Sequence, residues 1–243
     1  MTRPPFALCY HGLGTPRPGT DPHGLLLDPS LFAAQLDDLQ RRGHRLVTAS
    51  ELWDGVQRGE GRGLGAITFD DGLAATMHIA VGLLGERGAG ATLYVPSGLL
   101  GREHPDLASG ERILDRSGVQ EIADAGVEIG AHTVDHVDLR TLPYADALDQ
   151  LRRNKADLED ITGRPVRSLA YPYGAFGPDT IRAAQEAGFD SAWGCSGPAP
   201  WRSHALPREP VFPSTSIRRL RLKAAGRYGP MHRAARVRAR LRG

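Results

Sequence analysis

The sequence predicts an α/β protein whose parallel strands close, or nearly close, into a barrel. Short apolar runs alternate with segments of helical composition for most of the 243 residues, a pattern typical of βαβ units with helices on both faces of a sheet. About seven such repeats in one domain favour a barrel over an open sheet. Several polar side chains directly follow apolar runs, where barrel proteins carry their functional residues.

The first half of the chain has three expected strands and three expected helices. The strands are at 5–10, 46–47 and 65–69, and the helices are at 31–39, 48–57 and 74–87. Phe32, Leu36 and Leu39 recur at helical spacing in the first helix. Thr48 or Ser50 can cap the second helix. The segment before the first helix is rich in proline and glycine and predicts a loop.

The second half continues the alternation. Strands are expected at 91–95, 127–131, 166–171, 190–194 and 206–212, and helices at 119–125, 144–160 and 178–187. Gly126 and Gly188 follow two of these helices and are typical helix stops. Residues 97–118 form a long polar loop, and loops of that length are usually functional rims or mobile segments.

Composition indicates an ordinary soluble globule. Hydrophobic residues make up 40% and charged residues 24% of the chain, enough to bury a real core. No stretch approaches the ~20 apolar residues of a membrane span, and the N-terminus lacks the apolar core of a signal peptide. We therefore expect a cytoplasmic protein, unless a leader precedes this sequence. Cys9 and Cys195 form no disulfide framework and are expected to be small core residues.

The net charge of +2 hides an asymmetry. Residues 217–243 carry ten Lys or Arg and no acid, which leaves 20 basic and 28 acidic side chains in residues 1–216. We expect a globular domain over 1–216 and a basic tail over 217–243 that is flexible or lies on a surface. Such a tail is either a solvated arm or a segment attracted to an anionic membrane surface. No recognition motif or aromatic interleaving supports nucleic-acid binding.

Two adjacent carboxylates end the strand expected at 65–69. Successive residues of a strand point to opposite faces, so Asp70 and Asp71 can serve one site only where strand geometry breaks. Gly72 permits such a break. The alternative is an ordinary solvated Asp-Gly turn.

His132 and His136 form a second motif. On a single helical turn, an i, i+4 pair can present both imidazoles to one ion. Two imidazoles and one carboxylate give a three-ligand site with an open position, as in catalytic zinc sites. The alternative is two solvated loop histidines beside Asp135 and Asp138.

These motifs together resemble those of a known family. Residues 68–72 (Thr-Phe-Asp-Asp-Gly) and 132–136 (His-Thr-Val-Asp-His) are similar to the first two signatures of the polysaccharide deacetylases, the NodB-homology proteins of carbohydrate esterase family 4. Residues 170–174 (Ala-Tyr-Pro-Tyr-Gly) resemble the third signature, and 10–12 and 32–52 resemble the N-terminal stretch. The resemblance covers roughly residues 5–215 and implies a distorted (β/α)7 barrel, the NodB-homology fold, over the domain of residues 1–216.

The resemblance also implies roles for individual residues. The implied ligands of one divalent ion are Asp71, His132 and His136. Zinc is the default ion, with cobalt, nickel, manganese and iron as alternatives. Asp70 is the implied general base that deprotonates a metal-bound water for attack on the acyl carbonyl. The backbone N–H of Tyr173, which follows Pro172, is implied to hold the developing oxyanion.

The sequence departs from the commoner family pattern in two places. It lacks the late Leu-x-His motif that supplies the acid, and Ala170 replaces the arginine of the third motif. The bacterial exopolysaccharide N-deacetylases share both departures, and this resemblance makes His11 the candidate acid. The alternative for His11 is a core histidine at a strand end. Arg208 either replaces the missing arginine and orients Asp70 or forms a structural ion pair, and Thr133 is expected to support the site by hydrogen bonding.

The function expected from this resemblance is metal-dependent hydrolysis of an N-acyl group, with acetyl as the expected group. The expected substrate is a sugar, a glycolipid or a glycan precursor. One alternative is a deformylase or another C–N amide hydrolase acting on a small metabolite. Another is a non-catalytic glycan- or metal-binding module on the same fold, which could lose Asp70 freely. A third is a membrane-docked partner protein that acts through its basic tail.

Overall fold

The computed structural model describes residues 3–16, 19–105, 110–195 and 201–227. Its main sheet contains β1 (Phe6–Tyr10), β4 (Arg45–Val47), β5 (Leu64–Phe69), β6 (Thr92–Val95), β7 (Glu128–Ala131), β8 (Ser168–Ala170), β9 (Ser191–Gly194), β10 (Leu206–Pro207) and β11 (Glu209–Pro210). A small second sheet pairs β2 (Gly12–Leu13) with β3 (Leu26–Leu27). The helices are α1 (Pro29–Arg41), α2 (Ala49–Gln57), α3 (Ala74–Gly85), α4 (Arg116–Asp124), α5 (Tyr144–Thr162), α6 (Pro178–Glu186) and α7 (Ile217–Ala224). Short 3₁₀ turns cover Ser97–Leu99, Leu139–Thr141 and Pro172–Gly174.

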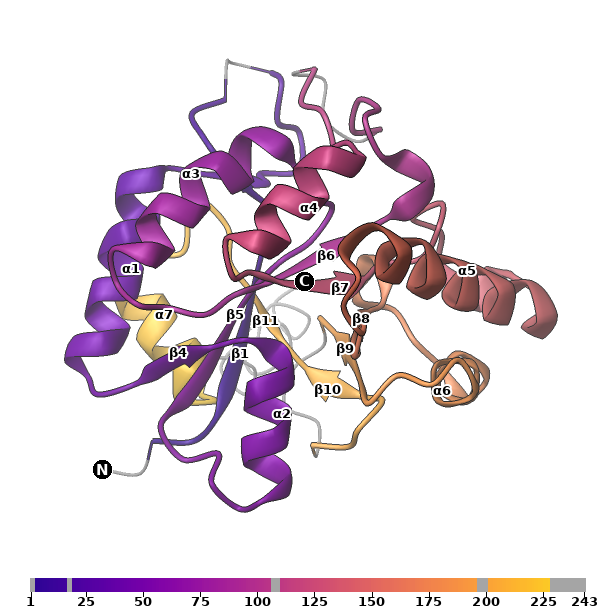
Figure 1. Cartoon of the computed structure of the whole chain (residues 1–243). Coiled ribbons are helices and arrows are strands. Elements are labelled where there is room, and N and C mark those ends of the chain that lie inside the picture. The colour runs from indigo at the N-terminus through magenta and orange to yellow at the C-terminus, as the bar shows by residue number, and fades with distance from the viewer. Residues whose placement is uncertain (1–2, 17–18, 106–109, 196–200, 228–243) are drawn as a thin grey trace, which may run out of the picture.

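The sheet is parallel and nearly closed. Its strands follow the order β10-β9-β8-β7-β6-β5-β1-β11, and β4 pairs with the first half of β5. β10 pairs with β9 and β11 pairs with β1, although only Arg208 separates β10 from β11. One short segment therefore joins the two ends of the sheet. The prediction of an α/β barrel with parallel strands is confirmed, and Figure 1 shows its helices around the strands.

The last expected strand, 206–212, is wrong as a single element. The backbone changes partners at Arg208, whose N–H donates to the Gly194 carbonyl (2.9 Å), while the Val211 N–H donates to the Cys9 carbonyl (2.8 Å). Pro207 and Pro210 lack the N–H that a continuous ladder would need at their positions. The break leaves the Arg208 side chain fully buried.

Strand side chains alternate between two cores. In β1, Phe6, Leu8 and Tyr10 belong to a large cluster shared with the surrounding helices, whereas Ala7 belongs to a smaller one that also contains Trp193. This period of two separates the outer layer from the barrel interior. Buried polar and charged side chains accompany these cores, among them Thr68, Asp70 and Arg208.

Helix starts follow local capping chemistry. Asp28 caps α1 ahead of a proline at the first helical position, and Thr48 caps α2 in a capping box with Glu51. The Thr48 prediction is confirmed. α4 begins at Arg116, earlier than the expected 119, because the Asp115 side chain accepts a hydrogen bond from the Gly118 N–H (2.8 Å).

The first part of the basic tail is an ordered helix. Leu220 and Ala224 of α7 are buried, and Arg221 forms an ion pair with Asp38 of α1. α7 lies beside α1 (Figure 1), so residues 217–224 are not a solvated arm. The remainder of the tail from residue 228 lies outside the described residues. Within the described part of the chain, no helix has the length and apolar character needed to cross a membrane.

Candidate active site

The predicted site residues gather at one rim of the barrel. His11 follows β1, Asp70 and Asp71 follow β5, His132 follows β7, and Tyr173 lies shortly after β8. Because these strands are parallel, their carboxyl ends open on the same side. Segments more than 160 residues apart thus supply a single cluster of side chains.

Asp71, His132 and His136 form the centre of this cluster. Their candidate ligand atoms all lie within 4.8 Å of one another. The Asp71 Oδ1 atom is 3.4 Å from His132 Nε2 and 3.2 Å from His136 Nε2, yet it is buried without a hydrogen bond. One carboxylate oxygen and two imidazole nitrogens form the donor set of a three-ligand site for a divalent ion. The orphaned oxygen and this donor set therefore fit a metal ion.

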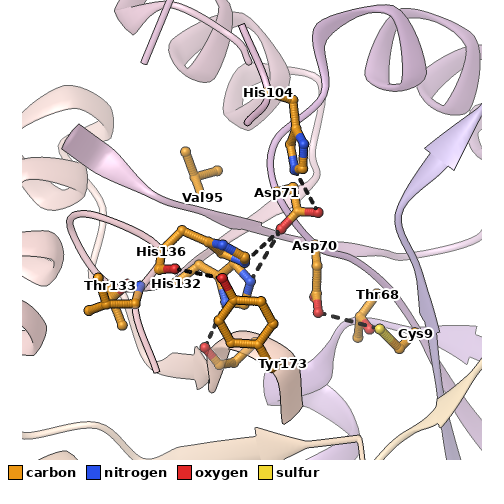
Figure 2. Close-up of polar contacts among 12 residues, drawn as sticks. Cys9, Thr68, Asp70, Asp71, Val95, His104, His132, Thr133, His136 and Tyr173 are labelled. Carbon is orange, nitrogen blue, oxygen red and sulfur yellow. Dashed lines mark hydrogen bonds and ion pairs between the residues drawn. The ribbon is translucent and has the colours of Figure 1, made fainter. Parts of the chain in front are cut away.

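His132 is oriented by its neighbours so that Nε2 faces the cluster (Figure 2). Its Nδ1 lies 2.7 Å from the Ala170 carbonyl oxygen, which can only accept, so Nδ1 carries the proton. In the neutral ring the lone pair is then on Nε2, as a metal ligand requires. The His132 backbone N–H donates to Asn154 Oδ1 of α5 (2.7 Å), and Asn154 Nδ2 donates to the Val95 carbonyl (3.1 Å).

The rim concentrates unusual backbone conformations. Among the described residues, the non-glycine residues with positive φ are Asp71 (70°), Thr133 (65°), His136 (54°) and Tyr173 (59°). Such conformations cost free energy and cluster at functional sites. Asp71 itself and Gly72 (φ 70°) break the strand, as expected. His132 and His136 meet without the helical turn on which an i, i+4 pair can do so. Residues 132–136 form a loop, which Thr133 Oγ1 stabilises by accepting a hydrogen bond from the Val137 N–H (3.4 Å).

Asp70 is held by a bidentate ion pair inside the barrel. Arg208 donates from Nη1 to Asp70 Oδ1 (2.6 Å) and from Nη2 to Oδ2 (2.8 Å), and Nη1 also reaches Thr68 Oγ1 (3.0 Å). The Cys9 thiol lies 3.3 Å from Asp70 Oδ2. Burial raises the pKa of the Asp70 carboxyl, but the charge of Arg208, aided by His132, outweighs burial and holds the pKa below its usual value. Asp70 is therefore ionised at neutral pH.

Asp71 is also held in its ionised form. Burial raises the pKa of its carboxyl, but contacts with His104, His132 and His136 outweigh burial and hold the pKa well below its usual value. His104 is a residue that sequence reasoning missed. Its Nε2 lies 3.1 Å from Asp71 Oδ2, and its side chain is buried. The length of the 97–118 loop was the only sequence signal near it.

Two more residues complete the rim. His11 lies next to Asp70, since ligand atoms of Cys9, His11 and Asp70 are within 4.8 Å of one another. A cation is not favoured in this second group, because Arg208 already engages both oxygens of Asp70.

Tyr173 follows the buried Pro172 and is 65% exposed, and its ring packs on that of His136 with centroids 5.0 Å apart. The site is thus open on the side of Tyr173.

Both cysteines lie behind this site. Cys9 and Cys195 are unoxidised, and the contact with Cys195, together with burial, raises the pKa of the Cys9 thiol. A neutral thiol is a poor nucleophile. Cys9 therefore lacks the environment of a catalytic nucleophile, whereas its hydrogen bond with Cys195 lowers the pKa of the Cys195 thiol.

Comparison with known sequences gives a consistent result. The sequence model of the family described as polysaccharide deacetylase matches residues 58–192. A curated relative, "Putative polysaccharide deacetylase YxkH" of Bacillus subtilis (strain 168), is 24% identical over 123 residues, which are 51% of this chain and 41% of that protein. The match therefore spans less than half the length of this relative.

Solved structures share the fold. The Streptococcus pyogenes deacetylase PplD in complex with acetate superposes with a TM-score of 0.79 and 22% identity, over 92% of this chain and 98% of that one. IcaB from Ammonifex degensii gives a TM-score of 0.71 and 24% identity, over 91% and 97%. A de-N-acetylase from Aggregatibacter actinomycetemcomitans gives 0.76 and 16%, over 89% and 98%. With this fold, and with a family match that covers more than half of the chain, the protein belongs to the polysaccharide deacetylase family.

Proposed function

We propose that this chain is a metal-dependent hydrolase that removes an N-acyl group, acetyl in the first instance, from a sugar unit of a glycan or glycan precursor. One observation carries the proposal. A carboxylate kept ionised by a buried arginine, Asp70, directly precedes the orphaned carboxylate of a three-ligand cluster, Asp71. A binding module has no need of the first carboxylate, whereas a hydrolase needs a base beside its metal ligands.

Asp71, His132 and His136 would hold the ion, with zinc as the default because the donors are nitrogen and oxygen. Such an ion lowers the pKa of a bound water toward about 7 and polarises a carbonyl oxygen. Asp70 accepts the proton of the attacking water. Arg208 weakens Asp70 as a base but keeps it ionised and fixes the direction of both oxygens.

His11 and Tyr173 have proposed roles on either side of the reacting amide. His11 protonates the leaving nitrogen, because it lies beside Asp70 and imidazole is the side-chain group that most often serves as a general acid. Tyr173 offers its backbone N–H to the developing oxyanion, and its left-handed conformation orients this peptide at the exposed edge of the site. Acetyl as the acyl group is supported by two structural neighbours, since PplD forms a complex with acetate and another neighbour is named a de-N-acetylase.

The basic tail supports a further partner, an anionic membrane surface. Arg218, Arg219 and Arg227 are exposed, and no acidic residue follows residue 216. Basic side chains near an anionic surface each contribute about 1 kcal/mol of attraction. A lipid-linked sugar would then be a suitable substrate.

Acetate release from a panel of N-acetylated sugars, oligosaccharides and sugar lipids tests the hydrolase. The assay compares metal-stripped protein, zinc-restored protein and Asp70→Asn, with the metal content of each measured. Asp54→Asn is the matched control, because Asp54 also pairs with an arginine (Arg167, 2.9 Å) but lies away from the rim.

Zinc-dependent release that is lost in Asp70→Asn with the metal still bound, and kept in Asp54→Asn, is the expected result. Stoichiometric metal without release from any substrate would instead favour the binding module. A wild-type protein that takes up no metal after reconstitution would overturn the proposed site.

A further inference from the structure

Two described stretches between the 3₁₀ turn Ser97–Leu99 and α4 pair with each other. The Gly101 N–H donates to the Leu114 carbonyl (3.0 Å), the Ile113 N–H to the Arg102 carbonyl (2.8 Å) and the His104 N–H to the Glu111 carbonyl (2.8 Å). Residues 101–105 and 110–114 thus run antiparallel as two arms. His104 lies on the first arm, in a position that backbone hydrogen bonds define.

The second arm is joined to the turn that carries Asp71. Leu73 and Ile113 form an antiparallel bridge, the Leu114 N–H donates to the Gly72 carbonyl (2.9 Å), and the Ala74 N–H donates to the Arg112 carbonyl (2.9 Å). Ile113 and Leu114 are buried. Backbone hydrogen bonds therefore connect the two arms to the turn after β5, and they define the position of His104 relative to Asp71.

His104 and the two other histidines face different oxygens of the Asp71 carboxylate. Its Nε2 is 3.1 Å from Oδ2, with side chains that are 2% and 4% exposed, whereas His132 and His136 face Oδ1. Figure 2 shows Asp71 between His104 on one side and the two other histidines on the other. Since a carboxylate oxygen can only accept, His104 Nε2 carries the proton of this contact.

We propose that His104 is a positioning residue for the metal centre: it donates to Asp71 Oδ2 and holds the carboxylate so that Oδ1 alone faces the ion. This inference rests on the proposed metal site. A carboxylate free to rotate could bind a cation through both oxygens or turn Oδ1 away from His132 and His136. Hydrogen bonds to ligating carboxylates fix such ligands, and their loss typically costs about 10- to 100-fold in metal affinity.

The placement of His104 does not favour a fourth ligand. Its ring centroid is 6.4 Å from that of His136, whereas the rings of His132 and His136 are 4.9 Å apart. Its Nε2 faces the oxygen that points away from the pair. One position of the ion therefore stays available for water and substrate.

Zinc affinity, measured by competition with a chromophoric chelator, tests this role in three variants. His104→Leu removes the donor, His104→Gln keeps an N–H donor, and His204→Leu is the matched control. His204 is also buried, but its ring nitrogens contact the Phe189 carbonyl and the Ser203 hydroxyl. Circular dichroism and thermal unfolding establish that each variant is folded.

We expect His104→Leu to bind zinc about 10- to 100-fold more weakly, His104→Gln to recover most of the loss, and His204→Leu to match wild type. With cobalt in place of zinc, the visible absorption bands of His104→Gln should keep their wild-type positions. Shifted bands would make His104 a ligand, and unchanged affinity in a folded His104→Leu would remove its role, so either result overturns the inference alone. A wild type that binds neither metal overturns the proposed function as well.

Discussion

At the scale of single residues, Arg208 determines whether Asp70 can act as a base. Its guanidinium is fully buried and contacts both oxygens of Asp70. Without it, the largest influence that lowers the pKa of Asp70 is lost, and burial favours the protonated acid. The same arginine therefore keeps the Asp70 carboxylate charged and offsets the free-energy cost of burying that charge.

Substituting Arg208 tests this argument. Arg208→Met should cost about 3–5 kcal/mol of unfolding free energy, because it leaves a buried charge without its partner. The pKa of Asp70 should rise, so the acidic limb of the kcat/KM profile should move to higher pH. Arg208→Lys keeps the charge but not the bidentate geometry and should lie between wild type and Arg208→Met. Urea denaturation and pH–rate profiles measure both effects.

Arg167→Met is the control for Arg208→Met. Arg167 also forms a bidentate pair, with Asp54, but it is partly exposed and lies away from the rim. Its loss should leave the pH–rate profile unchanged. A folded Arg208→Met variant with a wild-type acidic limb would show that Arg208 does not control Asp70.

The lowered pKa of Asp70 also predicts how stability depends on pH. The folded-state pKa lies below the unfolded value of about 3.9, so the ionised carboxylate stabilises the fold fully above about pH 4. This contribution is lost as the pH falls through the folded-state pKa. In metal-free protein, the gap in unfolding free energy between wild type and Asp70→Asn should therefore narrow at acid pH. Denaturation series at several pH values measure the gap, and a gap that widens on acidification would contradict the prediction.

Sequence reasoning reached the site residues that lie in compact motifs. Four of them meet at the rim as expected: Asp70, Asp71, His132 and His136. Each belongs to a short sequence motif that follows an expected strand, so the sequence indicates its position directly. His104 belongs to no such motif and follows no expected strand. Its contact with Asp71 depends on the fold of a long loop, and no periodicity in the sequence shows which way a lone loop histidine points.

At the scale of elements, α5 positions the histidine loop from behind. Asn154 connects the His132 N–H to the Val95 carbonyl, and Gln150 Oε1 accepts from the N–H groups of Val134 and Asp135 (both 3.0 Å). These hydrogen bonds hold the loop in place where a helical turn would have used its own backbone hydrogen bonds. The i, i+4 spacing of His132 and His136 indicated the candidate metal ligands but not the backbone conformation between them. The left-handed conformations of Thr133 and His136 occur in a loop whose hydrogen-bond partners lie on a separate helix, α5.

Asn154→Leu should loosen this loop. The change leaves the His132 N–H and the Val95 carbonyl buried without partners, at a cost of about 1–3 kcal/mol for each group. Metal affinity should fall with stability, because His132 loses the hydrogen bond that positions its backbone. Chemical denaturation and chelator competition measure the two effects. Thr162→Val is the control, because this buried hydroxyl on the same helix bonds its own helix at Leu158, and equal behaviour of the two variants would refute the role of Asn154.

At the scale of the whole molecule, the alternation of strands and helices predicted a closed or nearly closed barrel, but not how the two ends of the sheet are joined. Each βαβ unit is encoded locally by apolar runs and helix caps. Closure depends on residues 206–210, which pair with β9 and then with β1. The sequence predicts one strand here, because two successive pairings with distant partners leave no local pattern. The break at Arg208 is also what delivers the arginine to Asp70, so closure and site chemistry depend on the same residue.

The basic tail gives a prediction that concerns the molecule as a whole. Removing residues 217–243 would delete α7, expose the surface that Leu220 and Ala224 cover, and break the ion pair of Arg221 with Asp38. The informative truncation therefore ends at Arg227. It removes five arginines and no acidic residue, while it leaves α7 in place.

The truncated chain should keep the thermal stability of the full chain and its activity on a soluble N-acetylated sugar. It should bind vesicles of phosphatidylserine and phosphatidylcholine more weakly than the full chain, because each lost arginine removes about 1 kcal/mol of attraction near an anionic surface. Co-sedimentation at low and high salt measures this, since screening should abolish the difference between the two chains. Vesicles of phosphatidylcholine alone are the control. Equal binding of the two chains to the anionic vesicles would leave the tail without a membrane role, whereas activity lost on the soluble sugar would place part of the tail in the catalytic machinery.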